Sequence, residues 1–531
     1  MSFSGAPDSL CACTPCFGSI RRPFIESNLS SLLVVTKQTD KWHVVFQAKG
    51  GVTVAVLRFG FMERQEEDLI HAQSIECLER IGVLIHSQSV LNMLRDAGAE
   101  VDPKKKVAKI PEKVVNDAVK KAPKAITLGA RDPKRDLKIP VERFPFVSTG
   151  GVTVFMTDLE TGERRKATSR DLADFARLTD AMDPVDAFWP IVTTSDVAAH
   201  AQFANELWVS LQNTTKHILG SAGSGTLGIP DAKTQIALGA LVAGGPEKLK
   251  KRPLFSVLSC IVPPLVFEKG AVEAQVEYAR AGIPIISMSM CMGGMTAPVT
   301  LAGTILTLNI ENLASLVVTQ TAAPGAPHIY CSEATLGNVV TGLIGYRGPE
   351  APMIFAAAAQ MARRYGLPKM TGILGIDGEV PGVPISFGEV SAMMLTTMSG
   401  TDLCSGIGGL DLDKGCSLEQ VVIDSAMWEE YRAFMRDFPV TEESAALKVI
   451  ERVGQGNTFL NDPHTVRNFR SQMLIRNKRM ELYGATMSDR MVLDARDVVR
   501  EILKEHSVEQ LDEHTLSEGN EILSTYAGSR R

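Results

Sequence analysis

Residues 284–303, PIISMSMCMGGMTAPVTLAG, join a strand, a loop and the start of a helix in one short stretch. Pro284–Met290 is an apolar run with the length of a buried strand. Thr296-Ala-Pro298 opens a helix that we predict from Val299 to Ala322. The loop 291–295 between them holds two glycines and no charge.

Strand-to-helix loops of parallel α/β proteins lie at the carboxyl ends of the strands, where ligands bind. The glycines of this loop allow a ligand or a neighbouring backbone to approach closely. We therefore expect the thioethers of Met288, Met290 and Met295 to form one wall of an apolar pocket for a small molecule.

The same order of short apolar strand, loop and helix recurs through the middle of the chain. Eight strands are predicted: Val147–Met156, Phe188–Thr194, Lys216–Ser221, Leu254–Cys260, Pro284–Met290, His328–Ser332, Lys369–Leu374 and Asp402–Ile407. Near-continuous apolar strands that alternate with helices indicate a parallel sheet buried on both faces. Eight units favour an α/β fold with a closed (β/α)8 TIM-type barrel, which would span residues 146–438. A segment other than Val147–Met156 could supply the first strand.

The two ends of the chain differ from this pattern. Residues 1–60 show no clear period, and we expect a disordered or non-native extension, with Met62 as a possible true start. Residues 64–145 are predicted to form a helical N-terminal subdomain. Residues 439–531 are predicted to form a helical C-terminal segment, with a peripheral end from Asp512.

The composition argues against several classes of protein. The chain has 531 residues and a formal net charge of −6, which disfavours a nucleic-acid surface. No uninterrupted run of 18 apolar residues is present, so no membrane span is predicted. The nine cysteines are scattered apart from Cys11, Cys13 and Cys16, which indicates reduced thiols in the cytoplasm. No His or further Cys lies near those three to complete a metal site, so no metal is expected.

Carboxylates follow two of the late strands. Glu333 comes directly after the sixth strand, and Asp377 and Glu379 follow the seventh. Above a barrel they could meet as a cluster that suits an ammonium substrate or a proton transfer. Each could equally cap a loop or pair with a cation.

Three other side chains could complete such a site. Tyr330 and Phe387 could offer aromatic faces to a cation, although core packing suits Phe387 better. Arg347 could bind a substrate carboxylate through two hydrogen bonds, or pair with Glu350. The sequence contains no zinc-protease motif, no nucleophile elbow and no Walker loop.

Several stretches, in this order and spacing, resemble the trimethylamine methyltransferase (MttB) family over roughly residues 64–510. They are Leu78-Glu-Arg-Ile-Gly-Val83, Asp96-Ala-Gly-Ala-Glu-Val101, Leu159-Glu-Thr-Gly-Glu-Arg-Arg165, Ala297-Pro-Val-Thr-Leu-Ala-Gly303, Arg347-Gly-Pro-Glu350, Ala362-Arg-Arg-Tyr-Gly-Leu-Pro368 and Phe459-Leu460 with Pro463-His-Thr465. The resemblance implies a (β/α)8 barrel and an enzyme that moves a methyl group from a methylated amine to the Co(I) corrinoid of a separate protein. It also implies a homo-oligomer.

The founding members of that family carry pyrrolysine in the barrel, and its counterpart is expected around residues 371–377. No non-standard residue occurs in this sequence, so the chain looks like members that act on quaternary amines such as glycine betaine. Such a substrate needs a dry aromatic and apolar cradle, for which the methionines and Tyr330 are suited. Arg347 would bind the betaine carboxylate, and Glu333, Asp377 or Glu379 would balance the cation.

The corrinoid is expected to arrive on the partner protein, because the chain contains no cobalamin-binding Asp-x-His-x-x-Gly motif. Two alternatives to a methyltransferase remain open. A barrel lyase or aldolase would need a reactive lysine or a set of metal ligands at the strand ends, whereas Lys369 stands at the amino end of its strand. A non-catalytic protein that binds an amine or a corrinoid protein would share every feature above.

Overall fold

The computed structural model describes residues 60–223, 227–346, 348–372, 378–382, 387–436, 438, 440–473 and 489–529. The strands β1 (Leu33–Val35), β2 (Trp42–Lys49) and β3 (Val52–Phe59), and residues 387–389 and 489, are described by their backbone alone. The predicted extension over residues 1–60 therefore lies largely outside the described residues.

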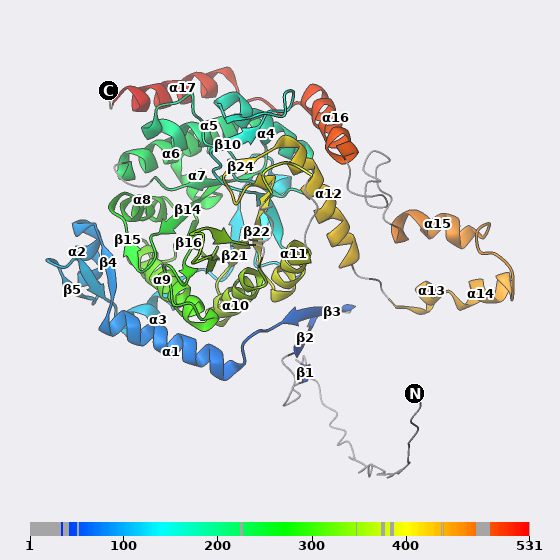
Figure 1. Ribbon diagram of the computed structural model, residues 1–531, viewed down its shortest axis with the longest axis horizontal. Helices are drawn as coiled ribbons and strands as arrows, with labels where there is room; N and C mark the ends of the chain where they lie inside the picture. Colours follow the sequence, from blue (N-terminus) through cyan, green and yellow to red (C-terminus); the bar gives the residue numbers. More distant parts are fainter. Residues whose placement is uncertain are drawn as a thin grey trace, which may run out of the picture.

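Eight parallel strands close into a barrel at the centre of the molecule (Figure 1). Around the barrel they follow the order β9 (Phe146–Thr149), β12 (Ala187–Phe188), β13 (His217–Ser221), β14 (Phe255–Ile261), β16 (Ile285–Ser289), β18 (His328–Ser332), β21 (Lys369–Gly372) and β22 (Leu403–Ile407). The last strand pairs with the first. The predicted (β/α)8 barrel is confirmed.

Helices follow the strands and form the outer layer (Figure 1). They are α4 (Ser169–Ala181), α5 (Gln202–Asn213), α6 (Gly228–Ala243), α7 (Pro246–Lys251), α8 (Lys269–Arg280), α9 (Leu301–Ala322), α10 (Glu350–Arg364), α11 (Phe387–Ser399) and α12 (Leu418–Phe434). Among the described helices, α9 alone is long and apolar enough to cross a membrane. It is a core helix, because 78% of its most apolar window is buried between its neighbours.

Apolar side chains fill the interior of the barrel at its amino end. The antiparallel hairpin of β7 (Ile126–Leu128) and β8 (Leu137–Ile139) closes that end. Its four inward residues join one apolar cluster with the inward residues of the barrel strands, among them Leu219, Ile286, Ile329 and Met370. Open space inside the barrel is therefore confined to its carboxyl end.

The predicted first strand, Val147–Met156, is two strands in the structure. The barrel strand β9 ends at Thr149, and Gly150-Gly151 turns the chain out of the barrel. The next strand, β10 (Phe155–Thr157), pairs instead with β11 (Arg164–Lys166) and β24 (Gly415–Cys416). The run looked continuous because apolar residues stand on both sides of the turn.

The N-terminal subdomain contains three helices, α1 (Arg64–Arg80), α2 (Gln88–Asp96) and α3 (Glu112–Lys121). Besides the hairpin β7–β8 it contains three further strands, β4 (Val83–Ile85), β5 (Glu100–Asp102) and β6 (Val107–Lys109). These form a sheet with β15 (Val266–Phe267), which ties the subdomain to the barrel. Strands of three residues are too short to show a period of two, so the sequence pattern did not reveal β4, β5 and β6.

The end of the chain packs on the barrel helices, which corrects its prediction as peripheral. Helix α16 (Asp489–Glu505) lies against α12 and α4, and α17 (Glu513–Gly528) lies against α6. The indole Nε1 of Trp208 donates to Asn520 at 2.9 Å. A Cβ on Gly519 would lie 2.2 Å from the Trp208 ring, so glycine permits this close contact.

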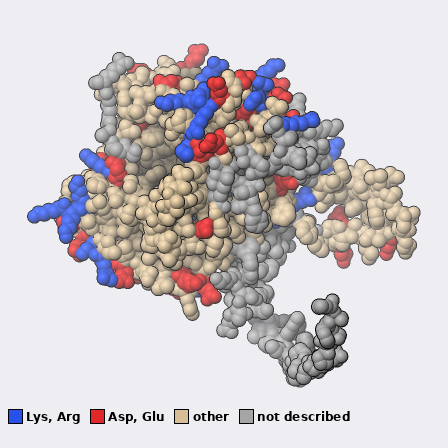
Figure 2. Space-filling view, viewed as in Figure 1, with Lys and Arg blue, Asp and Glu red and all other residues tan. Residues whose placement is uncertain are grey.

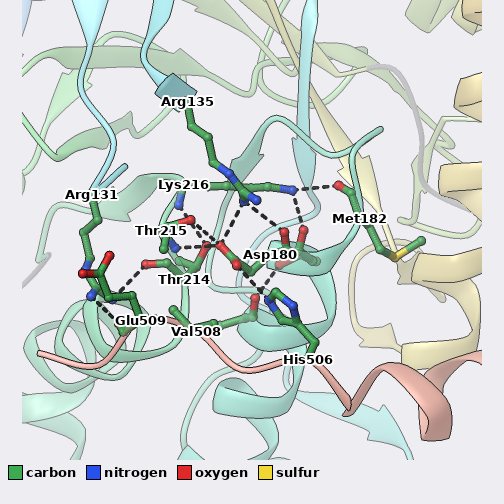
Figure 3. Close-up of polar contacts among 12 residues, drawn as sticks. Arg131, Arg135, Asp180, Met182, Thr214, Thr215, Lys216, His506, Val508 and Glu509 are labelled. Atoms are coloured by element: carbon green, nitrogen blue, oxygen red, sulfur yellow. Dashed lines mark hydrogen bonds and ion pairs between the residues drawn. The ribbon is translucent and has the colours of Figure 1, made fainter. Parts of the chain in front are cut away.

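A buried carboxylate fastens the segment between α16 and α17 to the amino end of the barrel (Figure 3). Asp180 Oδ2 lies 2.9 Å from His506 Nε2, and Oδ1 accepts from the Thr215 backbone at 2.7 Å and from Arg135 at 3.1 Å. Burial alone would raise the Asp180 pKa, but these hydrogen bonds lower it below its usual value.

Candidate active site

A cavity of about 460 Å³ opens at the carboxyl end of the barrel. Seven of the eight strands, or the residues just beyond them, contribute to its wall: Gly150–Val152, Trp189, Ser221, Leu258, Cys260, Met288, Met290, Glu333 and Ser405. Phe203, Glu268, Tyr346 and Asp413 add to the lining from the outer helices and loops. Its position is the one at which TIM-type barrels bind their substrates.

Strand alternation decides which side chains reach this cavity. Successive residues of a strand point to opposite faces. On β18, Ile329 and Cys331 lie inside the barrel, so Glu333, two residues further on, also points inward. On β16, Ile286 and Met288 lie inside, and Met290 follows them. The structure thus brings Met288, Met290 and Glu333 together, as expected.

The Glu333 carboxyl group is nearly buried, with 9% of the residue exposed. Its Oε1 accepts a hydrogen bond of 3.0 Å from Ser405 Oγ, on β22. A Cβ on Gly372 would lie 2.3 Å from Oε2, so the glycine of β21 makes room for the carboxyl group. Burial, and then the negative charge of Asp413, raise the pKa of Glu333 to about 8. Without a ligand this group is mostly protonated at neutral pH.

Two further carboxylates line the cavity. Glu268 is the N-cap of α8, and its Oε2 accepts from the Gly270 backbone at 2.8 Å. Asp413 lies in a turn in which Asp411, Leu412 and Asp413 all have positive φ, between 51° and 61°. Non-glycine residues adopt this conformation at a cost of roughly 1–2 kcal/mol each, so the surrounding contacts must hold the turn.

Ion pairs hold the left-handed turn in place. Asp411 lies 2.7 Å from the Arg164 guanidinium and 3.1 Å from Lys414 Nζ. The Asp411 backbone also donates to the Gly378 carbonyl at 2.9 Å. These contacts fix the position from which Asp413 faces the cavity.

Aromatic side chains form much of the remaining wall. Trp189 follows β12, Phe203 comes from α5, and Tyr346 follows β20 (Ile344–Gly345). The Tyr346 hydroxyl donates to the Glu333 backbone carbonyl at 3.4 Å. A Cβ on Gly151 would lie 2.2 Å from the Trp189 ring, so this glycine lets the indole lie flat against the barrel mouth. The wall suits a cation, because aromatic faces and thioethers are electron-rich.

Three predicted residues lie away from the cavity lining. Tyr330 falls on the outer face of β18, where its hydroxyl donates to Asn309 at 3.0 Å in the core beneath α9. Met295 packs on Gly337, because its loop forms β17 (Met292–Gly293) and pairs with β19 (Thr335–Gly337). Glu379 is exposed in a bend. This geometry corrects the expectation that Tyr330 and Met295 form the wall of the pocket.

Three other predicted residues, Arg347, Asp377 and Phe387, cannot be placed. Arg347 and Asp377 lie outside the described residues, and Phe387 begins α11 with its backbone alone described. Their roles remain predictions. Tyr346, the neighbour of Arg347, does line the cavity.

Sequence reasoning missed Trp189, Glu268 and Asp413. Trp189 was counted inside a predicted strand that in fact ends at Phe188. Glu268 is the N-cap of α8, a role that carboxylates often fill, so the local sequence gives no sign that it also lines a cavity. Asp413 reaches the cavity through a left-handed turn at residues 411–413 that contains no glycine, so no local sequence pattern predicts the turn.

The lysines of the barrel strands are structural. Lys369 pairs with the buried Asp402 at 3.0 Å, at the amino end of β21. Burial lowers the pKa of Lys216 to about 7, but its Nζ donates to the carbonyls of Thr179 and Met182 beside β13's amino end (Figure 3). Neither lysine lines the cavity, which removes the support for a lyase that uses either of them. Among the described residues, no cluster of His, Cys, Asp and Glu suits a metal.

Comparison with solved structures finds monomethylamine methyltransferase (MtmB) of Methanosarcina barkeri, with a TM-score of 0.45 and 12% sequence identity over 83% of this chain and 94% of that one. Among characterised sequences, trimethylamine methyltransferase MttB of Desulfitobacterium hafniense is 36% identical over 417 residues, 78% of this chain and 83% of the relative. Glycine betaine methyltransferase of Desulfitobacterium hafniense (strain Y51) is 28% identical over 82% of this chain and 88% of the relative.

The family profile for trimethylamine methyltransferase (MTTB) matches residues 38–528, which is nearly the whole chain. The match includes the barrel, both flanking segments and every described residue of the cavity lining. The chain belongs to the trimethylamine methyltransferase family.

Proposed function

We propose that this protein transfers a methyl group from a quaternary or other methylated amine, such as a betaine, to the Co(I) corrinoid of a partner protein. The observation that carries the proposal is the buried Glu333 carboxyl group in a cavity walled by aromatic rings and thioethers. Asp413 and Glu268 add negative charge at the same cavity, and its described lining includes no Lys or Arg. Such a site suits an alkylated ammonium group.

A quaternary nitrogen is already a leaving group, so the protein need not form a covalent bond to it. In the transfer, the carbon–nitrogen bond breaks and its electron pair stays on nitrogen, which leaves a tertiary amine. The two electrons of the new methyl bond come from the acceptor on the partner protein. The work of this chain is to bind the amine, turn one methyl group towards the open mouth and exclude water.

Glu333 would act as a counter-ion whose charge appears on binding. In the empty cavity the carboxyl group is mostly neutral, since its pKa is about 8. A nearby cation favours the ionised carboxylate, so binding of the ammonium substrate at neutral pH releases the Glu333 proton. After transfer the tertiary amine is neutral; once it takes a proton from solvent, the carboxylate would stabilise the resulting ammonium ion.

The open end of the cavity is where the corrinoid partner would dock, since methyl transfer requires direct contact with the acceptor. A cytoplasmic location agrees with the scattered cysteines, and the six described cysteines are all free thiols. Arg347 remains our candidate for binding a substrate carboxylate.

The proposal is tested by mixing the purified protein with single methylated amines and chemically reduced cobalamin. Appearance of the demethylated amine by mass spectrometry, in step with the visible spectrum of methylcobalamin, would support it. Because free cobalamin is a poor mimic of a protein-bound acceptor, the same panel should be repeated with a corrinoid protein. Binding of an amine without transfer to either acceptor would favour a non-catalytic binding protein.

A further inference from the structure

Residues 440–473 form an arm that stands clear of the barrel, to the right of the molecule in Figure 1. It contains α13 (Glu442–Ala445), α14 (Leu447–Val453) and α15 (Pro463–Gln472). None of these helices buries a residue or packs extensively against another described element. The arm therefore adds nothing to the hydrophobic core of its own chain.

The arm nevertheless carries large apolar side chains. Eight of them are exposed: Val440 (81%), Leu447 (64%), Ile450 (53%), Phe459 (42%), Leu460 (74%), Val466 (72%), Phe469 (47%) and Met473 (55%). Phe434 and Phe438, at the base of the arm, are 74% and 77% exposed. Isolated exposed apolar residues are ordinary, but a dense run on one segment marks an interaction surface.

The arm has a defined shape despite its lack of a core. Arg452 holds Asp462 through two hydrogen bonds of 2.9 and 2.8 Å. Asp462 caps α15 by accepting from the His464 backbone at 2.8 Å, and Thr465 Oγ1 donates to the Phe459 carbonyl at 2.7 Å. These polar contacts pre-form the turn that carries Phe459 and Leu460, the most apolar pair of the arm.

Such an arm needs a permanent partner surface. Helices of this length are only marginally stable alone in water, because tertiary packing supplies most helix stability in proteins. A partner that comes and goes, as a methyl acceptor must, would leave the arm unsupported between encounters. A second copy of the same chain would cover it throughout.

The net charge and the size of the arm also favour a second copy of the chain as its partner. The arm carries four acidic residues, Glu442, Glu443, Glu451 and Asp462, and four basic ones, Lys448, Arg452, Arg467 and Arg470. It is therefore neutral, and Figure 2 shows it as a mostly uncharged projection, which disfavours nucleic acid or an anionic membrane. A stable interface takes roughly 20 to 30 residues from each partner, which one arm can supply alone.

We propose that the arm of each chain packs on the body of a second copy, in a reciprocal exchange that holds the oligomer together. Two-fold symmetry would bury two arms in one assembly, which is well above the size of a standard interface. The proposal rests on the proposed function only in excluding the methyl acceptor as the occupant. It can fail without the reaction failing, because none of the arm's residues lines the cavity.

The first test is the mass of the full-length protein in solution, by light scattering after size exclusion. The wild type should be a dimer or a larger oligomer, and the double variant Leu460→Ser/Phe469→Ser should dissociate at least tenfold more readily. The control is Leu69→Ser/Ile81→Ser, which removes two exposed apolar side chains (56% and 65%) from the body and should leave the mass unchanged. A monomeric wild type at tens of micromolar would overturn the proposal.

The second test does not depend on how well the double variant folds. A photo-crosslinking amino acid at position 460 of the otherwise native protein should give a product of twice the chain mass. Peptide mapping should place the crosslink on the body of the other copy, shown with a mixture of isotope-labelled and unlabelled chains. A crosslink within one chain, or to a different protein, would overturn the proposal. In the first test, an oligomer of the same stability in the wild type and the double variant would also overturn it.

Discussion

Ser405 Oγ on β22 donates to Glu333 Oε1, beyond the end of β18, at 3.0 Å across the mouth of the barrel. The strand between them, β21, ends in Gly372 and leaves space for the carboxyl group. Among the described residues one hydrogen bond reaches this carboxyl group, which does not replace the hydration of a carboxylate, so Glu333 stays mostly neutral until a cation arrives.

Removal of the Glu333 charge should weaken the use of a cationic substrate. Glu333→Gln keeps the shape and can still accept from Ser405, but it cannot ionise. A charge-assisted contact is worth about 1.5–3 kcal/mol, so we expect kcat/KM to fall roughly 10- to 100-fold. Steady-state methyl transfer measures this. Glu379→Gln, on an exposed side chain outside the lining, should change kcat/KM less than about twofold; equal losses in both variants would contradict the assignment.

Binding of a permanent cation should depend on pH through Glu333. The pKa of the free group is about 8, so below pH 8 binding must release a proton, and affinity should rise with pH up to about 8 and then level off. Calorimetry with tetramethylammonium in buffers of different ionisation enthalpy measures the released proton. Glu333→Gln should bind with no such release. A wild-type affinity that is flat between pH 6 and 8 would argue against the counter-ion role.

The Trp189 indole should contribute to the binding of the ammonium group. A cation–π contact is worth about 0.5–2 kcal/mol, so Trp189→Leu should raise KM roughly 2- to 30-fold, with a smaller effect on kcat. Trp189→Phe keeps an aromatic face and should recover most of the loss. If the leucine and phenylalanine variants are equally impaired, the ring acts through packing alone.

Gly372 should be essential for the position of Glu333. In Gly372→Ala the new methyl group would lie 2.3 Å from Oε2, so the carboxyl group must move. We expect at least about a tenfold loss in kcat/KM with little change in Tm, since a shift of about 1 Å at a reacting site is costly. Gly528→Ala, where the added methyl group meets nothing within 4 Å, is the matched control. Full activity in Gly372→Ala would show that the carboxyl position is unimportant.

The Asp180 cluster should stabilise the fold without affecting chemistry, since it lies at the amino end of the barrel (Figure 3). Asp180→Ala should lower the free energy of unfolding by about 2–5 kcal/mol, because it leaves buried donors without a partner. The Asp180 pKa is depressed, so its contribution is present above the ordinary carboxyl pKa and is lost as pH falls through the lower, folded value.

Thermal unfolding at pH 7 and pH 3 measures both effects of Asp180. Asp96→Ala, on a largely exposed side chain paired with its neighbour Arg95, should cost less than about 1 kcal/mol. A difference between wild type and Asp180→Ala that stays constant between pH 7 and pH 3 would contradict the linkage.

The sequence predicted the barrel well because each strand is apolar on both faces and each helix has marked ends. Because the strands are apolar on both faces, the sequence does not indicate which side chains point into the barrel and which point outward. On β18 the five residues are all buried, so nothing in composition separates the outward Tyr330 from the inward Cys331. Side chains alternate between the two faces of a strand. If Glu333 points into the barrel, Tyr330, three residues earlier, must point out of it.

Residues from distant loops were harder to predict. Met288, Met290 and Glu333 were found because they stand at strand ends, where barrel chemistry is expected. Asp413 reaches the cavity only because Arg164 and Lys414 hold the turn through Asp411 in a left-handed conformation. That arrangement depends on contacts across the sequence, which no local pattern contains.

The most direct test of the proposed function is methyl transfer from single amines to the cob(I)alamin of a purified corrinoid protein, with the demethylated amine measured by mass spectrometry. We predict turnover with one or more quaternary amines, at a rate that Glu333→Gln lowers roughly 10- to 100-fold. Absence of transfer across quaternary and tertiary amines, by protein that still binds them, would contradict the account and indicate a binding protein instead.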